Sequence, residues 1–113
     1  MLEVDAIADS EVTLTRIPKS LADRLHLDPL ETRIITDAEG LSHTCSYVGL
    51  QVKFENRHSL TGALVFGDEL ILGSTTMLDL DVVIAPDSRK LIVKPASPNI
   101  AHGFVFTFFP KAA

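Results

Sequence analysis

The 113-residue chain lacks several features that would place it in a common functional class. Its single cysteine, Cys45, cannot form an internal disulfide, so nothing points to an oxidising compartment. Ten scattered Lys and Arg residues against fifteen Asp and Glu argue against nucleic-acid binding, which needs clustered basic side chains. No apolar run approaches a membrane span, and no basic-then-apolar signal peptide opens the chain. We therefore expect a cytoplasmic protein that binds neither nucleic acid nor membrane.

What the chain has is a high apolar content, 46%, which is enough to bury the core of one domain. Short alternating or β-branched segments are separated by turn signals, a pattern that predicts strands. Two further segments, 18–27 and about 74–80, have short apolar stripes typical of small helices. The predicted strands are 2–8, 13–17, 32–36, 41–54, 59–66, 70–72, 82–84 and 90–93.

Many short strands with two small helices indicate a mainly β fold, closed or folded over as a barrel. We expect one β domain over residues 1–94, followed by a tail over 95–113. The tail contains an apolar, phenylalanine-rich run at 104–109. Such a run is a liability when exposed, so we expect it to pack on the domain or at a dimer interface.

Two segments stand out in their order along the chain. The first is Asp9-Ser10, a carboxylate on a loop directly after an apolar strand, with the strand 13–17 and Pro18 following. The second is 62–67, followed closely by Leu70-Ile71-Leu72-Gly73 and a short helix. With both segments at this separation, the chain resembles the retropepsin-like aspartic proteases, the single-domain family of retroviral proteases and small prokaryotic relatives. The resemblance covers about residues 2–93.

The resemblance implies a closed acid-protease-like barrel that forms a homodimer and hydrolyses peptide bonds without a cofactor. Asp9 matches the catalytic aspartate, of which each subunit supplies one. Two carboxylates close together cannot both ionise cheaply, so such a pair shares a proton and titrates as a unit. The ionised member activates water while the protonated member polarises the scissile carbonyl. Ser10 would hydrogen-bond across the interface, and Thr13 would support the site.

The resemblance also implies a flap, the hairpin tip that closes over substrate. Its residues here are Asp37, Ala38, Glu39 and Gly40, a polar turn that ends in glycine. A peptide substrate would then lie beneath the flap as an added strand.

Glu11 departs from the family pattern, which has glycine at this position. Glycine permits unusual backbone angles and the close approach of a ligand, whereas glutamate fills space beside the dyad. In a dimer it also brings two further carboxylates toward the axis. We therefore expect peptidase activity to be reduced or lost, and the alternative is a catalytically silent dimeric binding or structural module.

Simpler interpretations remain for each of these residues. Asp9 is a common residue type in a turn after a strand, and Glu11 suits a solvated loop. A carboxylate cluster at this loop could instead bind a hard cation such as Ca²⁺, although nothing else has a metal-ligand spacing, so we expect no metal. The four histidines also lack such a spacing. Cys45 in mid-strand suits a small buried apolar role.

Overall fold

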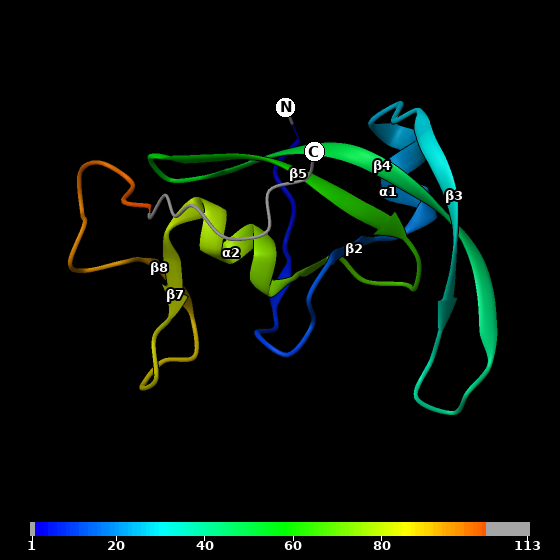
Figure 1. Ribbon diagram of the computed structural model, residues 1–113. Helices are drawn as coiled ribbons and strands as arrows, with labels where there is room; N and C mark the ends of the chain where they lie inside the picture. Colours follow the sequence, from blue (N-terminus) through cyan, green and yellow to red (C-terminus); the bar gives the residue numbers. More distant parts are fainter. Residues whose placement is uncertain (1, 104–113) are drawn as a thin grey trace, which may run out of the picture.

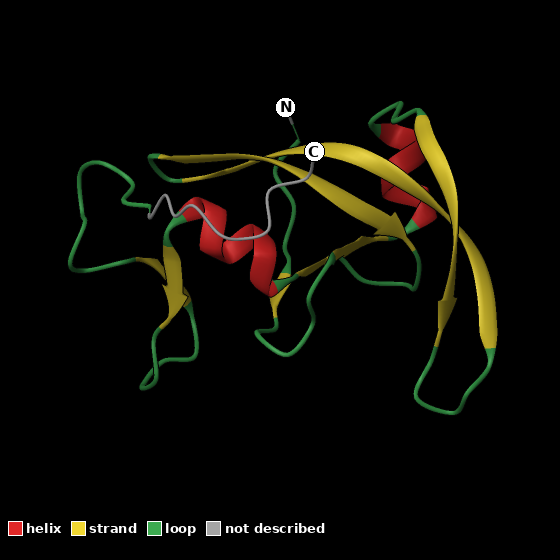
Figure 2. Cartoon of the chain, in the orientation of Figure 1, coloured by secondary structure: helices red, strands yellow, loops and turns green. Residues whose placement is uncertain are grey.

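The computed structural model describes residues 2–103, and the predicted strand at 104–109 lies outside them. Two short helices interrupt the succession of strands along the chain (Figure 2). The mainly β fold with short helices is therefore confirmed. The elements are β1 (Ile7–Ala8), β2 (Thr15–Ile17), α1 (Lys19–Arg24), β3 (Pro29–Thr36), β4 (Ser42–Phe54), β5 (Arg57–Val65), β6 (Ile71–Leu72), α2 (Ser74–Leu80), β7 (Val82–Ile84) and β8 (Leu91–Val93).

Six of the strands form one mixed sheet in the order β1-β6-β2-β5-β4-β3, while β7 and β8 form a separate antiparallel pair. Within residues 2–103, β1 pairs with β6 alone and β3 pairs with β4 alone, so the sheet has two free edges. The described residues therefore do not form the closed barrel that the sequence led us to expect. They form an open, curved sheet with a hairpin beside it (Figure 1).

Several element boundaries differ from the prediction, and for two of them the reason can be identified. The first strand was expected over 2–8, but only Ile7 and Ala8 are paired, because their partner β6 is itself two residues long. The third strand was expected over 32–36, after the helix 18–27, but β3 already begins at Pro29, a position that proline tolerates at a sheet edge. The register shifts between Pro29 and Glu31, opposite Val48 and Tyr47.

Each helix covers one part of the sheet and creates its own core. Helix α1 buries Leu21 and Ala22 against a cluster that includes Ile17, Val48 and Ala63. Helix α2 buries Met77 and Leu80 in a second cluster with Val82 of β7, against which the far end of β4 and residues of β1 and β8 pack. Cys45 is buried in β4, as its position in the middle of the predicted strand indicated.

The arrangement of β1, β6 and β2 determines where the candidate catalytic loop lies. Strand β6 is inserted between β1 and β2, parallel to β1 and antiparallel to β2. The loop 9–14 joins β1 to β2 and must therefore pass around the end of β6. The chain leaving β6 hydrogen-bonds to this loop, from Ser74 N to Val12 O at 2.7 Å and from Thr75 N to Thr13 O at 3.2 Å. The two loops hold each other in place.

The described part of the tail packs on the domain. The Asn56 side chain, in the β4–β5 turn, donates to the carbonyl oxygens of Pro98 at 3.1 Å and Asn99 at 3.2 Å. Arg57 is buried and donates through Nη2 to the Ser97 carbonyl. The Ser97 hydroxyl and the His102 N–H also donate to the carboxylate of Asp81, directly after α2. Residues 97–102 are therefore fixed to the β4–β5 turn and to the end of α2.

Candidate functional site

Asp9 lies immediately after β1 in a tight turn. Its N–H donates to Leu72 O at 3.1 Å, which continues the pairing of β1 with β6 by one step. Its carbonyl accepts from Val12 N at 3.2 Å, and its Oδ1 accepts from Glu11 N at 3.0 Å. The side chain is half-buried. An aspartate that bonds to the backbone two residues on stabilises this kind of turn, so part of its role is structural.

Ser10 and Glu11 follow Asp9 at the tip of the turn, and both are exposed. Glu11 is not among the non-glycine residues with positive φ, which in the described chain are His26, Glu55, Asp81 and Arg89. The backbone strain that replacing glycine was expected to cause is therefore absent. What remains of the expected effect of Glu11 is its bulk and charge beside Asp9.

Gly73 makes the closest backbone approach at the site. A Cβ atom at this position would lie 2.4 Å from the Thr13 carbonyl oxygen and 2.7 Å from the Leu14 carbonyl carbon. Real Cβ atoms do not come this close to a backbone, so the crossing of the two loops requires glycine here. The Thr13 carbonyl also accepts from the Thr75 hydroxyl at 2.8 Å, which makes Thr13 a fixed part of the crossing.

Three threonine hydroxyls lie behind the crossing and link three elements. Thr76 Oγ1 of α2 is 2.6 Å from Thr15 Oγ1 of β2 and 2.9 Å from Thr61 Oγ1 of β5. Thr15 Oγ1 also accepts from Gly73 N at 3.1 Å. Thr15 and Thr76 are completely buried. Our sequence analysis missed this cluster, because its three threonines lie far apart along the chain.

The predicted flap residues form the turn between β3 and β4, as expected from their sequence. Asp37 organises the turn: its Oδ1 accepts from Glu39 N at 2.9 Å and Leu41 N at 3.0 Å. Gly40 donates to the Asp37 carbonyl and has a φ of 84°, which glycine adopts without strain. Ala38 is exposed at the tip. The turn is confirmed, whereas its role as a flap stays a prediction.

A chain of side-chain contacts leads from this turn to β2. His43 Nε2 lies 2.8 Å from Asp37 Oδ2, and the His43 ring centroid lies 5.3 Å from that of Phe66. The Arg16 guanidinium lies 5.7 Å from the Phe66 centroid, a cation–π distance. The hydrogen bond to His43, together with the N–H groups of Leu41 and Glu39, holds the pKa of Asp37 below its usual value.

Strand register connects Arg16, the last residue in these contacts, to the strand that precedes the candidate aspartate. Arg16 of β2 pairs with Ile71 of β6, which pairs in turn with Ile7 of β1. Directly paired residues share a face, and side chains alternate along each strand. Asp9 follows β1 directly, two residues after Ile7. One face of β2 carries Thr15 and is buried, whereas Arg16 and Ile71 share the more exposed face.

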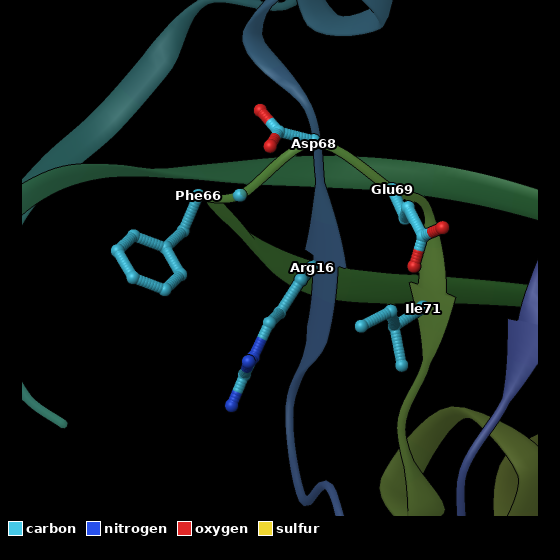
Figure 3. A pocket seen from close by; sticks show the side chains of 6 residues that line it. Arg16, Phe66, Asp68, Glu69 and Ile71 are labelled. Carbon is cyan, nitrogen blue, oxygen red and sulfur yellow. The ribbon is translucent and has the colours of Figure 1, made fainter. Parts of the chain in front are cut away.

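A shallow pocket of about 270 Å³ opens on this face. It is lined by Arg16, Phe66, Gly67, Asp68, Glu69 and Ile71 (Figure 3). Phe66 and Ile71 are half-buried and provide its apolar surface, and the acidic side chains are exposed at its rim. The sequence analysis did not predict this pocket, because its residues come from β2, the turn after β5 and β6.

Nothing in residues 2–103 resembles a metal centre. No group of three or more His, Cys, Asp or Glu side chains among them is arranged to hold a metal ion, and Asp9 with Glu11 does not form one. No helix in the same part of the chain is both long and apolar enough to cross a membrane.

No protein-family model matches the chain, and a search of curated proteins found none similar to it.

Proposed function

We propose that this chain is an aspartic-peptidase-like protein with a retropepsin-like fold, which acts as a homodimer with one Asp9 per subunit. The observation that supports this most is the crossing of two loops at the end of β6. Asp9 begins one loop, and Gly73 of the other loop allows their backbones to approach. The crossing fixes a half-buried carboxylate beside a sheet edge, where a second copy can approach it.

The chemistry follows from pairing two such carboxylates across a twofold axis. One Asp9 keeps a proton while the other is ionised, because two negative carboxylates close together repel each other. The ionised carboxylate takes a proton from a water molecule, and the protonated carboxyl donates a hydrogen bond to the scissile carbonyl. The exposed hydroxyl of Ser10 is next to Asp9 in the chain and is available for a hydrogen bond to the second subunit.

The substrate in this proposal is an extended peptide held between the sheet and the β3–β4 hairpin. Figure 1 shows the turn of this hairpin and the loop after β1 at the same, lower side of the molecule. The hairpin turn contains Asp37, Ala38, Glu39 and Gly40, and His43 connects it to Phe66. Closure of this turn over a bound peptide is its role as a flap.

Glu11 supports a second candidate function, a catalytically silent dimeric module that binds through the same groove or has a structural role. Glu11 is exposed and lies two residues after Asp9, so a dimer brings two additional carboxylates toward the Asp9 pair. Their repulsion opposes the protonation state that hydrolysis requires. Wild-type activity is therefore weak or absent under this proposal, and the groove remains available for binding.

A cleavage assay separates the two functions. Wild type, Asp9→Asn and Glu11→Gly would be incubated with a broad peptide library between pH 3 and pH 7, and products identified by mass spectrometry. Cleavage by wild type that disappears in Asp9→Asn supports the peptidase. Cleavage gained only in Glu11→Gly, and lost in the double variant with Asp9→Asn, supports a disabled descendant. No cleavage by any variant contradicts an aspartic-peptidase site.

The dimer requires its own measurement. Light scattering coupled to size-exclusion chromatography should give twice the chain mass of 12.3 kDa. A monomer at high protein concentration would contradict the shared dyad.

A further inference from the structure

We infer that the pocket between Arg16, Phe66 and Glu69 is a subsite for a basic side chain, lysine or arginine, of a bound peptide. This inference rests on the proposed function, because it deepens the specificity of the same groove. It concerns recognition alone, so it holds or fails independently of whether the chain cleaves the peptide.

The first observation that supports this inference is the place of the pocket in the sheet. Ile71 is paired with Arg16 on one side and with Ile7 on the other, and Asp9 follows Ile7 by two residues. The pocket residue Ile71 thus belongs to β6, the strand beside β1 and the candidate aspartate. An extended peptide that passes Asp9 and continues along this part of the sheet presents alternate side chains to it, and one of them enters the pocket.

The size and lining of the pocket define the kind of group that fits. Its volume of about 270 Å³ is below the range of roughly 300–1,000 Å³ for sites of drug-sized ligands, so it suits a single side chain. The Phe66 ring and Ile71 form an apolar surface on which the methylene groups of lysine or arginine can pack. The rim is polar, so a long side chain with a charged end matches both parts.

The charges at the rim select the sign of that end group. Asp68 and Glu69 form no ion pair within the described residues, and neither does Arg16. Figure 3 shows the Arg16 guanidinium directed away from Asp68, and this cation already lies over the face of Phe66. Two unpaired carboxylates against one stacked cation leave the rim net negative. A cationic end group is therefore attracted, and an acidic one is repelled.

Fluorescence anisotropy with defined peptides tests the inference. The probes are fluorescein-labelled octapeptides with an alanine–serine background and one central residue, which is Lys, Arg, Leu or Glu. The protein carries Asp9→Asn, so that no peptide is cleaved during the titration. Because exposed charge pairs are individually weak, we expect the Lys and Arg peptides to bind about three- to tenfold more tightly than the Glu peptide at low salt.

The double variant Asp68→Asn/Glu69→Gln should abolish this preference, and it leaves the fold intact because both side chains are exposed. Asp87→Asn removes one exposed acid in the turn between β7 and β8, away from the pocket, and as a control it should retain the preference. Equal binding of Lys and Glu peptides, absence of binding by all peptides, or a preference that survives in the double variant overturns the inference. Failure of the cleavage assay with a retained basic preference contradicts the peptidase and leaves the subsite in place.

Discussion

Gly73 lies so close to Thr13 that a methyl group on its Cα would be 2.4 Å from the Thr13 carbonyl oxygen. The atom in the way belongs to the backbone, not to the flexible end of a side chain, so it cannot simply rotate aside. The chain leaving β6 can cross the Asp9 loop at this distance only because residue 73 has no Cβ.

Gly73→Ala should therefore destabilise the protein by about 1–3 kcal/mol, the usual cost of overpacking a site that must shift. Urea denaturation followed by circular dichroism measures this change. The control is Gly49→Ala, where an added Cβ would meet only Leu30 Cδ1 at 3.9 Å, an ordinary contact. Equal stability of Gly73→Ala and Gly49→Ala would contradict the tight crossing.

The buried threonine cluster behind the crossing should be energetically coupled. Thr15→Val removes the oxygen that accepts from Gly73 N and contacts Thr76, and we expect a loss of about 1–3 kcal/mol. Thr76→Val should cost a similar amount. The double variant should cost less than the sum, with a coupling energy of about 0.5 kcal/mol or more in a double-mutant cycle. Additive losses would show that the two hydroxyls do not form the bond described.

A buried ion pair should respond unequally to removal of its two partners. Arg57 Nη2 lies 3.8 Å from Asp81 Oδ2, and Arg57 Nε and Nη1 are buried with no hydrogen-bond partner among residues 2–103. Asp81→Asn leaves a buried cation without its counter-charge, whereas Arg57→Met removes a poorly satisfied one. Asp81→Asn should therefore destabilise the fold more than Arg57→Met does. A larger loss for Arg57→Met in urea denaturation would contradict this account.

An exposed ion pair shows how small the loss of stability should be when the charges are not buried. Lys19 and Asp23 of α1 form an i,i+4 pair at 2.9 Å, with both side chains largely exposed. Lys19→Met should change the free energy of unfolding by less than about 0.5 kcal/mol.

The carboxylate of Asp81 also determines how the stability of the fold depends on pH. The Ser97 hydroxyl and then the His102 N–H hydrogen-bond to Asp81 and hold its pKa below the ordinary value of 3.8. The folded state therefore binds this proton less tightly than the unfolded state does. The stabilisation is present above about pH 4 and is lost as the pH falls through the lower pKa of the folded state. Asp37 acts in the same direction, through its bond to His43.

Urea midpoints at pH 6 and pH 3 measure this effect. Wild type should lose stability between these values, and Asp81→Asn should lose less because one of the responsible carboxylates is gone. The control Asp87→Asn should retain the wild-type loss. An unchanged pH dependence in Asp81→Asn would show that its hydrogen bonds do not distinguish the ionised form.

The sequence predicted the local elements well where one signal dominated. Strand 82–84 is β-branched and bounded by turns, and the turn at 37–40 combines an aspartate with a glycine at positive φ. Both are decided by neighbouring residues, and both appear where expected. Asp9 was also placed correctly on a loop after a strand, although its catalytic role and the dimer stay predictions.

What could not be predicted depends on contacts between distant segments. Gly73 and Thr13 are far apart in sequence, so their close approach left no local pattern. The burial of Arg57 follows from the packing of 97–102 on the β4–β5 turn, whereas an arginine in a turn normally indicates exposure. Closure of the sheet failed as a prediction for the described residues because strand count alone does not determine how edges pair.

A crystal structure of the full chain in its solution assembly tests the central claim most directly, through the separation of Asp9 carboxylates between copies. The account predicts that two Asp9 side chains face each other across a twofold axis and share one water molecule, with Glu11 beside them. Asp9 on an outer surface, remote from any second copy, would contradict it.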